Sequence, residues 1–502
     1  MTTPAPTLQP TRAILAIDLG TTQAKAGLVT LDGRLLALAR AAYPLLVSDE
    51  RGAAEQDPGE WWAAIVTMTA ELLAATAAGG AVEVLAICAD GQGPTLVVAD
   101  GDGRPIAPAV TWLDSRCIAD ESTMAAATGA HGWTLGILPR ARWFERQRPA
   151  LAERARWYLA SWEWVALRLS GVAGRTSLPA QVHPDLALVA ATGLSTDRVP
   201  PLVAAGTVIG GLRPGPAAEL RLTPGIPVVA GMADAHASFI GAGLLEPGDA
   251  IDTGGTSGGF AVYTDRPVDI PGVFGAAAPI PGRWFLGGAM NATGKALEWF
   301  RDDVLAGQPP ITDLLAEAAD LVAGADGLVF LPYLAGERSP IWDPTARGAF
   351  VGLTLRHRRA HLARAILEAS DLALRHVAAP IVAAGVPITE LRVSGGLARE
   401  AVWNRVKADV TGFVVAVPQV VETAMLGSAI TAAAGIGWYA DLATGARTMV
   451  RIRERIEPDP DRRRIYDALY AIYVELYPAL RPAFQGLATV ERGSSGGVED
   501  PG

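Results

Sequence analysis

Cysteine and histidine are scarce in this chain of 502 residues. It has two cysteines, Cys88 and Cys117, and of its six histidines only His357 and His361 lie close together. Two cysteines do not form a disulfide framework, so the sequence predicts a reducing, cytoplasmic location. No Cys/His spacing suits zinc, which excludes a zinc finger and a zinc metalloprotease.

Basic runs and long apolar runs are also missing. Lys and Arg number 42 against 52 Asp and Glu, so the net charge is −10. An acidic chain without a basic run argues against a nucleic-acid partner. No stretch approaches the ~20 uninterrupted apolar residues of a spanning helix, and the N-terminus does not resemble a signal peptide. We therefore expect neither nucleic acid nor a membrane as a partner.

Two common nucleotide-binding motifs are absent as well. A Walker A loop would need a glycine five residues before Gly294 and Ser or Thr after Lys295, where this chain has Ala289 and Ala296. No Gly-x-Gly-x-x-Gly follows a predicted strand. These absences disfavour a P-loop kinase and a Rossmann dehydrogenase.

The composition indicates a globular chain of more than one domain. Half of the residues are apolar and 19% are charged, which excludes a disordered chain. At roughly 150 residues per domain, the length predicts two to four domains. Only the ends are predicted to be disordered, namely residues 1–11, rich in Thr and Pro, and residues 486–502, which finish in RGSSGGVEDPG.

The predicted elements fall into two similar halves. The first half opens with three strands joined by turns, continues with a helix capped by Asp57, and then alternates strands and helices. The expected spans are Ala13–Ile17, Ala26–Thr30, Arg34–Ala39, Trp61–Ala78 and Val84–Cys88. The second half repeats this opening, because residues 250–257 (AIDTGGTS) echo residues 16–22 (AIDLGTT). We interpret the echo as an internal duplication.

A turn-rich step at Leu245–Gly248 separates the halves. The sequence therefore predicts an α/β fold with domains at 12–247 and 248–485. The second domain is expected to be mostly helical after its first strands and to end in an amphipathic helix. The helices expected there are Lys295–Val304, Arg359–Ala379, Ala401–Thr411 and Arg462–Leu480.

Each half opens with a turn that suits phosphate. After the first strand, Gly20 lets the backbone approach an anion, and Thr21 and Thr22 add hydroxyl donors. Asp18 can accept hydrogen bonds from the waters of Mg²⁺. A plain hairpin turn uses the same residue types. The recurrence of the turn in the second half favours the phosphate interpretation.

Asp234 lies between a predicted strand, Pro227–Ala230, and a helix of small residues, Ala233–Gly241. Open α/β folds bind ligands at such junctions. The helix N-terminus keeps the carboxylate ionised, ready to accept a proton from a hydroxyl. The other interpretation, in which Asp234 only caps its helix, stays open here.

The order of short motifs along the chain resembles the FGGY family of carbohydrate kinases. The resemblance spans about residues 14–439 and rests on IDLGTT at 17–22, EQDP at 55–58, GQ at 91–92, WLDSR at 112–116, GMAD at 231–234, GTS at 255–257, LPY at 331–333, GERSP at 336–340, RG at 347–348 and SGG at 394–396. No single motif is specific, but the ordered set is. It implies two actin-like (ribonuclease-H-like) domains with a cleft between them, with ATP mainly on the second and the sugar mainly on the first.

The resemblance also assigns roles to the residues at matching positions. Asp234 matches the general base that deprotonates the sugar hydroxyl, and Asp18 matches the acidic residue near Mg²⁺. ATP and Mg²⁺ are the implied cofactors. The residues that match contacts with them are Asp18, Gly20, Thr21, Thr22, Gly255, Thr256, Gly294, Gly395, Gly396 and Glu400.

Two departures from the family pattern bear on the sugar. Gly93 and Pro94 stand where xylulokinases carry Met-His, and Ala235 stands where many relatives carry Asn or Gln. Polar contacts with the sugar are thus missing. The candidate replacements, each of which can equally be structural, are Asp90, Gln92, Trp112 and His236.

The sequence thus predicts an ATP-dependent kinase for a small carbohydrate: a pentulose, sugar acid or polyol. A homodimer is a possible assembly. The alternative is an actin-like ATP-binding module without kinase activity. The intact set Asp18, Thr22, Asp234 and Thr256 favours the kinase.

Overall fold

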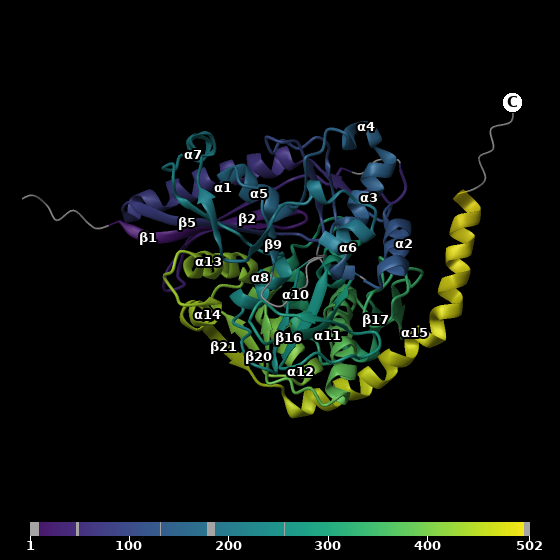
Figure 1. The fold of residues 1–502 in the computed structure, drawn as a ribbon. Coiled ribbons are helices and arrows are strands. Elements are labelled where there is room, and N and C mark those ends of the chain that lie inside the picture. The colour runs from purple at the N-terminus through teal and green to yellow at the C-terminus, as the bar shows by residue number, and fades with distance from the viewer. Residues whose placement is uncertain (1–9, 47–49, 131, 178–185, 256, 496–502) are drawn as a thin grey trace, which may run out of the picture. The chain divides into compact units, whose positions relative to one another are not determined.

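The computed structural model describes residues 10–46, 50–130, 132–177, 186–255 and 257–495 (Figure 1). The chain forms two compact units. Unit 1 comprises Met1–Gly243, Ala278–Pro281 and Glu422–Arg451, and unit 2 comprises Leu244–Ala277, Gly282–Val421 and Ile452–Gly502. Of the predicted disordered ends, residues 1–9 and 496–502 lie outside the described residues. The prediction of disorder is wrong for Thr11, which begins the first strand and donates a hydrogen bond from its N–H to the Ala81 carbonyl.

Unit 1 is built on a six-stranded sheet of order β11-β12-β5-β1-β2-β3. The central strand β1 is antiparallel to β2 and parallel to β5, so the predicted antiparallel opening is confirmed. β12 extends the parallel side, and β11 closes that edge antiparallel. The strands are β1 (Thr11–Leu19), β2 (Gln23–Thr30), β3 (Leu35–Ala42), β5 (Val82–Gly91), β11 (Val208–Gly211) and β12 (Pro227–Val229).

Unit 2 has a seven-stranded sheet of order β15-β16-β14-β13-β19-β20-β21. Its central strand β13 is antiparallel to β14 and parallel to β19. β20 adds a second parallel strand, and β21 closes the edge antiparallel. The strands are β13 (Asp249–Asp252), β14 (Gly258–Thr264), β15 (Phe274–Ala277), β16 (Trp284–Met290), β19 (Glu390–Val393), β20 (Val415–Pro418) and β21 (Ile452–Ile456).

The two sheets share one pairing pattern around their central strands. β1 and β13 each pair antiparallel with the next strand and parallel with a strand far along the chain. In both sheets a second parallel strand and an antiparallel edge strand follow. This shared topology supports the internal duplication that the echo predicts.

Smaller sheets complete both units. Unit 1 has a four-stranded sheet of order β4-β7-β6-β8 and the pair β10-β9, and unit 2 has the pair β17-β18. Their strands are β4 (Glu55–Gln56), β6 (Leu96–Ala99), β7 (Ala109–Val110), β8 (Trp157–Ala160), β9 (Arg175–Ser177), β10 (Leu202–Ala204), β17 (Val329–Leu331) and β18 (Ala349–Val351).

The helices of unit 1 include α1, whose N-cap is Asp57, as predicted; its side chain accepts a hydrogen bond from the Gly59 N–H at 2.8 Å. The helices are α1 (Pro58–Thr76), α2 (Ile118–Thr128), α3 (Leu138–Gln147), α4 (Pro149–Ala152), α5 (Ser161–Ser170), α6 (Leu186–Ala191), α7 (Pro214–Leu220), α8 (Asp234–Gly241), α13 (Thr423–Gly435) and α14 (Leu442–Met449).

One helix of the described residues, Pro58–Gly79 including the turn after α1, is long and apolar enough to cross a membrane by length and composition. The central helix of a globular core passes the same test. Trp61, Ile65, Met68 and Leu72 of this helix are buried in the core of unit 1 together with β1 and β2.

The helices of unit 2 are α9 (Thr293–Trp299), α10 (Ile311–Ala319), α11 (Arg359–Ala383), α12 (Ala401–Thr411) and α15 (Pro460–Ser495). α12 has the predicted bounds. The helix predicted over Lys295–Val304 is instead α9 followed by a π-helical turn at Phe300–Val304.

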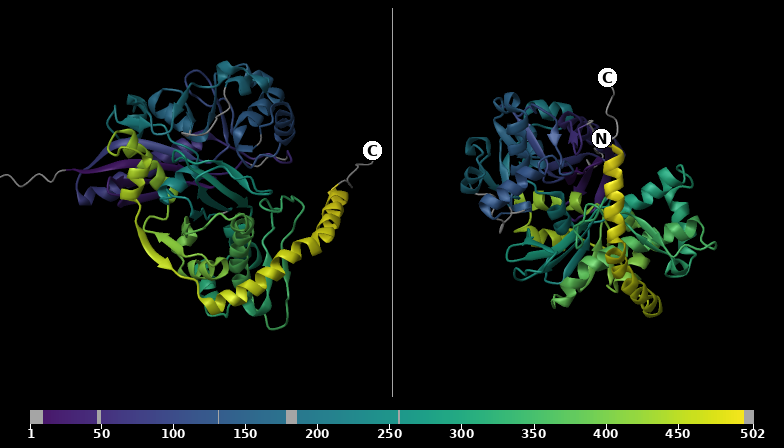
Figure 2. Two further views of the ribbon diagram at one scale, coloured as in Figure 1. Left: turned by 60° about the horizontal axis from the view of Figure 1, so that its bottom comes forward. Right: turned by 90° about the vertical axis from the view of Figure 1, so that its right-hand side faces the viewer.

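The C-terminal helix α15 is longer than predicted. It forms one continuous helix to Ser495 (Figure 2), so the prediction of disorder is wrong for residues 486–495. Phe484 and Ala488 are buried, and Glu491 pairs with Arg347 at 3.0 Å. These contacts hold the helix in a region where composition alone predicted none.

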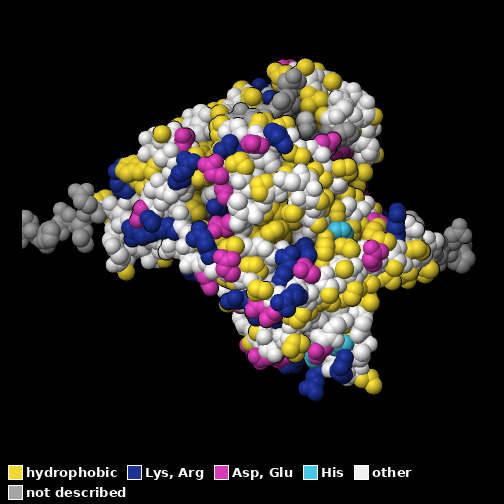
Figure 3. Space-filling view, turned by 90° about the horizontal axis from the view of Figure 1, so that it is seen from below, with side chains coloured by type: hydrophobic (Ala, Val, Ile, Leu, Met, Phe, Trp, Pro, Cys, Tyr) yellow, Lys and Arg dark blue, Asp and Glu magenta, His cyan; other side chains and the backbone are white. Residues whose placement is uncertain are grey.

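Charged side chains of both signs are interspersed on the face of the molecule in Figure 3.

The exposed large apolar residues of α15 include Ile465, Ile472, Leu487 and Val490.

Segment Glu422–Arg451 packs in unit 1, whereas the predicted division at 247/248 assigned it to the second domain. The reason is a close crossing of α13 with α8. A Cβ added to Gly427 would lie 1.9 Å from the Ala237 carbonyl oxygen, and one added to Gly241 would lie 1.8 Å from that of Thr423. Only glycine permits backbone contact at this distance.

We predict that Gly427→Ala lowers the free energy of unfolding by about 1–3 kcal/mol, because the added methyl group overpacks the crossing. Urea denaturation measures the change. Gly486→Ala is the matched control, since Gly486 also lies in a helix but, in the part of the chain that the structure describes, no atom lies within 4 Å of a Cβ added to it. It should leave stability unchanged or raise it by up to ~1 kcal/mol. Equal effects of the two substitutions would contradict the close crossing.

Candidate functional site

Three carboxylates lie at the carboxyl ends of neighbouring parallel strands in unit 1. The register pairs Asp18 of β1 with Asp90 of β5. The next residue, Gly91, forms a parallel bridge with Ala233, which directly precedes Asp234. The carboxyl edge of a parallel sheet, where the strand order leaves room between loops, is where open α/β folds place ligands.

The three carboxylates differ in accessibility. Asp90 is fully buried and Asp18 is 6% exposed, whereas Asp234 keeps part of its surface accessible. The Asp234 Oδ1 accepts a hydrogen bond from the Ala235 N–H at 2.7 Å. Asp234 is therefore the carboxylate of this cluster that a solute can reach most readily.

One ammonium group contacts this cluster. Lys25 of β2 lies opposite Asp18, and its Nζ is 3.3 Å from the Asp18 Oδ2. The negative charge of Asp18 raises the pKa of Lys25. Burial, and then the charge of Asp18, raise the pKa of Asp90 well above its usual value. The same two causes raise the pKa of Asp234 to about 7. The expectation that the helix N-terminus keeps this carboxylate ionised is therefore wrong, because burial and the charge of Asp18 outweigh the hydrogen bond from the Ala235 N–H.

Asp90 was predicted to contact the sugar. The structure places it beneath the surface, where its Oδ2 accepts a hydrogen bond from the Ser428 hydroxyl of α13 at 2.6 Å. This environment suits a supporting role under Asp18 and Asp234. A direct sugar contact stays a prediction.

The turn after β1 is held by side chains from other elements. The Gly20 carbonyl accepts a hydrogen bond from the Tyr43 hydroxyl, and the Thr21 carbonyl accepts one from the Gln56 amide at 2.6 Å. The Thr21 hydroxyl accepts a hydrogen bond from the Trp112 indole at 2.9 Å. Thr22 is exposed. The turn is thus fixed while one hydroxyl remains available.

Gln92 and Trp112, both predicted to bind the sugar, join this support. The Gln92 amide donates to the Gln56 Oε1 at 2.6 Å, and Gln92 is 1% exposed. Trp112 is partly accessible and bonds to Thr21. Gln56, Tyr43 and Lys25 were not predicted as site residues. Gln56 belongs to the EQDP motif, which is the one sequence signal that pointed to it.

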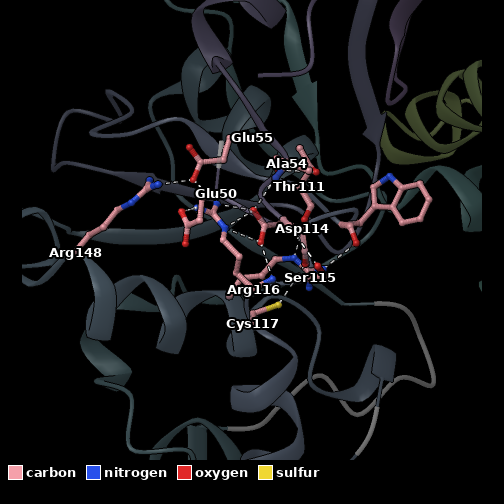
Figure 4. Close-up of polar contacts among 12 residues, drawn as sticks. Glu50, Ala54, Glu55, Thr111, Asp114, Ser115, Arg116, Cys117 and Arg148 are labelled. Carbon is pink, nitrogen blue, oxygen red and sulfur yellow. Dashed lines mark hydrogen bonds and ion pairs between the residues drawn. The ribbon is translucent and has the colours of Figure 1, made fainter. Parts of the chain in front are cut away.

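A salt-bridge network anchors the short strand β4 that carries Gln56 (Figure 4). The Arg116 guanidinium bonds to Asp114 and to Glu55 at 2.6 Å each, and stacks 4.1 Å from the centre of the Trp143 ring. The Asp114 Oδ2 also accepts a hydrogen bond from the Ala54 N–H at 2.9 Å. The EQDP and WLDSR motifs therefore act together, because they meet in one network.

His236 is 5% exposed and packs edge-to-face against Phe239, with 5.8 Å between ring centres. This packing fits a structural residue of α8. A sugar contact from His236 stays a prediction.

In unit 2 the second predicted phosphate turn follows β13. The Asp252 Oδ1 accepts a hydrogen bond from the Gly254 N–H at 2.9 Å. Gly254 has a φ of +58°, and an added Cβ would lie 2.2 Å from the Ser394 carbonyl oxygen. The turn thus requires glycine on two grounds. Thr256 lies outside the described residues.

The predicted glycines of unit 2 gather at this turn. A Cβ on Gly294 would lie 2.3 Å from the Gly255 carbonyl oxygen, and one on Gly395 would lie 3.5 Å from the Gly255 nitrogen. Gly396 is exposed, and no atom of the described residues lies within 4 Å of a Cβ added to it. Glu400 is the N-cap residue of α12. Gly255, Gly294 and Gly395 therefore share one location.

The described residues hold no group of three or more His, Cys, Asp or Glu side chains arranged to bind a metal ion. Mg²⁺ rarely needs such a cage, because it is commonly held by one or two carboxylates, waters and substrate phosphates. Asp18, whose Oδ2 contacts Lys25, is the carboxylate predicted to take part in a site of that kind.

Both halves of the chain match the FGGY family of carbohydrate kinases, its N-terminal domain over residues 13–241 and its C-terminal domain over residues 252–436. The chain belongs to this family. Its members are phosphotransferases that use ATP as the phosphate donor, so the chain is a carbohydrate kinase of α/β architecture with two actin-like domains. The cleft that the sequence resemblance implies between the domains stays a prediction.

Individual members of the FGGY family resemble the chain over nearly its full length. A gluconokinase from Bacillus subtilis (strain 168) is 28% identical over 517 residues, covering 96% of this chain and 99% of the relative. The crystal structure of a xylulose kinase from Rhodospirillum rubrum is 31% identical, with a TM-score of 0.77, and covers 94% of this chain and 100% of that one. A ligand-bound xylulose kinase from Lactobacillus acidophilus, 23% identical, shares the fold with a TM-score of 0.82 over 95% and 100%.

The raised pKa of Asp234 predicts a pH-dependent stability. Its folded-state pKa of about 7 exceeds the ordinary 3.8, so the folded state binds the proton more tightly than the unfolded state. The contribution of this group to stability is full below pH ~4 and is lost as the pH rises to ~7. Asp234→Asn removes the charge, and should raise the free energy of unfolding by about 1–3 kcal/mol at pH 8.

Urea denaturation at pH 5 and pH 8 tests this expectation. The increase in the free energy of unfolding of Asp234→Asn over wild type should be clearly smaller at pH 5 than at pH 8. Asp102→Asn serves as the control, because the Asp102 side chain is 72% exposed. It should show the same small effect at both pH values. A loss of stability in Asp234→Asn at pH 8 would show that the carboxylate is stabilised by its surroundings.

Proposed function

We propose that this kinase transfers the γ-phosphoryl group of Mg–ATP to a hydroxyl of a small sugar acid or ketose, with Asp234 as the general base. The observation that carries the proposal is the position of Asp234, which is partly accessible, lies at the carboxyl edge of the sheet and is beside two buried carboxylates. Its pKa of about 7 lets it accept a proton near neutral pH, as a general base must.

The proposed step moves one proton and exchanges one phosphorus–oxygen bond. The sugar hydroxyl donates its proton to the Asp234 carboxylate while its oxygen forms a bond to the γ-phosphorus. The bond from the γ-phosphorus to the bridging oxygen breaks, and ADP leaves. Such transfers depend on positioning and charge stabilisation more than on covalent chemistry. Asp234 serves the positioning through the hydrogen bond that it accepts from the substrate.

The two glycine-containing turns are proposed to hold the phosphates. In unit 1 the exposed Thr22 hydroxyl and the backbone after Gly20 are proposed to bind phosphate. In unit 2 the turn of Gly254 and Gly255 is proposed to do the same. Asp18 is proposed to contact the waters of the Mg²⁺ that enters with ATP. The ion would supply neutralisation of phosphate charge.

The names of the relatives define the first substrates to test. Gluconokinases and xylulose kinases align over almost the whole chain. Gly93-Pro94 stands where xylulokinases carry Met-His, and Ala235 stands where many relatives carry Asn or Gln, so we expect the sugar contacts of this chain to differ from those of a typical xylulokinase. The names of the relatives make gluconate and xylulose the first compounds to test, and these departures are the reason to extend the panel to other ketoses, sugar acids and polyols. Cytoplasmic location and homodimer formation stay predictions.

We predict that ADP release rises on addition of one sugar from a panel that begins with gluconate and xylulose. Asp234→Asn should lower that sugar-stimulated rate about 10³-fold or more, because the general base is lost. A coupled optical assay for ADP measures both. Asp102→Asn, an exposed surface change, should retain the full rate. Retention of the rate in Asp234→Asn would remove Asp234 from the role of base.

A further inference from the structure

A buried lysine in unit 2 is bound by two aspartates. Lys407 of α12 is 3% exposed, and its Nζ lies 2.7 Å from the Asp252 Oδ2 at the end of β13. The same ammonium group bonds to Asp371 of α11. Asp371 is fully buried and Asp252 is 8% exposed. These two negative charges raise the pKa of Lys407, so the lysine is charged throughout the neutral range.

The two oxygens of Asp252 have different partners. Oδ2 faces Lys407, whereas Oδ1 accepts the hydrogen bond from the Gly254 N–H at 2.9 Å. The ion pair therefore fixes the plane of the carboxylate, and the carboxylate fixes the turn. Gly254 also packs closely against the Ser394 carbonyl oxygen, which restricts movement of the turn in that direction.

A small cavity lies next to this cluster. Its lining includes Asp252, Lys407, Gly254, Gly255 and Asn404. Asn404 is 2% exposed, and among the described residues its Oδ1 has no hydrogen-bond partner. The lysine and its partner thus border an internal space that reaches the glycine turn and contains a buried acceptor.

We infer that Lys407 is a positioning residue of the nucleotide site, which holds Asp252 so that the Gly254–Gly255 turn keeps its backbone oriented for a phosphate. The inference rests on the proposed function of that turn. Lys407 acts only through Asp252 and does not contact the nucleotide. In unit 1 the aspartate at the equivalent strand end, Asp18, also pairs with a lysine, but this lysine, Lys25, comes from the adjacent strand.

Charge balance explains why this lysine would matter more than an ordinary buried contact. One ammonium group serves two carboxylates, so its removal leaves two buried negative charges close together. Asp252 would then turn away from Asp371. That change alters its hydrogen bond with Gly254.

Calorimetric binding of Mg–ADP to the full-length protein is the main test of the inference, and the KM for the sugar that the ADP assay identifies is the second. Lys407→Met keeps the length of the side chain and removes its charge. We expect its Kd for Mg–ADP to rise about tenfold to a hundredfold, as for the loss of other groups that orient a binding site. The KM for the sugar should change less than twofold, since the sugar is proposed to bind unit 1.

Two further variants separate positioning from folding. Lys407→Met combined with Asp371→Leu replaces the buried pair by apolar groups, a change that proteins often tolerate, and it should still bind Mg–ADP weakly. Asp371→Asn keeps the contact between Lys407 and Asp252, and should bind Mg–ADP within about twofold of wild type. Thermal unfolding confirms that each variant is folded.

The outcomes are distinct. Wild-type affinity for Mg–ADP in the folded double variant would overturn the role of Lys407. An equal loss in Asp371→Asn and Lys407→Met would show that the whole cluster acts structurally, which also overturns it. Failure of the wild-type protein to bind Mg–ADP would instead contradict the proposed function.

Discussion

The burial of negative charge at one edge of the unit 1 sheet is the constraint on which the account of the site depends. Asp18 and Asp90 are register partners on adjacent strands, and Asp234 follows the bridge from Gly91 to Ala233. Lys25 supplies one positive charge against these three carboxyl groups. Desolvation, and then the charge of Asp18, raise the pKa of the most accessible member, Asp234, to about 7. A carboxylate with the ordinary pKa near 4 is a weak base. Burial and the neighbouring carboxylates raise the pKa of Asp234 and so make it a stronger base.

The rest of unit 1 holds this arrangement in place. α8 carries Asp234 and crosses α13 with backbone contact at Gly241 and Gly427. α13 in turn supplies Ser428, which donates to Asp90. The turn after β1 is fixed by Gln56, on the strand anchored by Arg116. Helices and strands thus position these groups, and such elements hold a site more precisely than loops do.

Much of this could be predicted from the sequence, because local patterns determine it. The apolar run that ends in Asp18, the Asp57 N-cap and the echo at 250–257 predict the strands, the helix and the duplication, and the ordered motifs indicate the family. The remainder depends on contacts between distant residues. Register, which no local pattern encodes, brings Asp90 beside Asp18, and packing places Glu422–Arg451 in unit 1. The last turns of α15 were missed because their composition suits disorder, while Phe484 and Ala488 are buried.

The pH dependence of kcat/KM for the sugar tests the central claim most directly, since it reports the pKa of the essential base in the free enzyme. The account predicts that kcat/KM is low at pH 5, rises about tenfold per pH unit up to about pH 6, is half-maximal near pH 7, the pKa of Asp234, and levels off by about pH 8. Values that are flat from pH 5 to pH 8 would mean that the base titrates like an ordinary carboxylate. The buried cluster would then have no part in its activation.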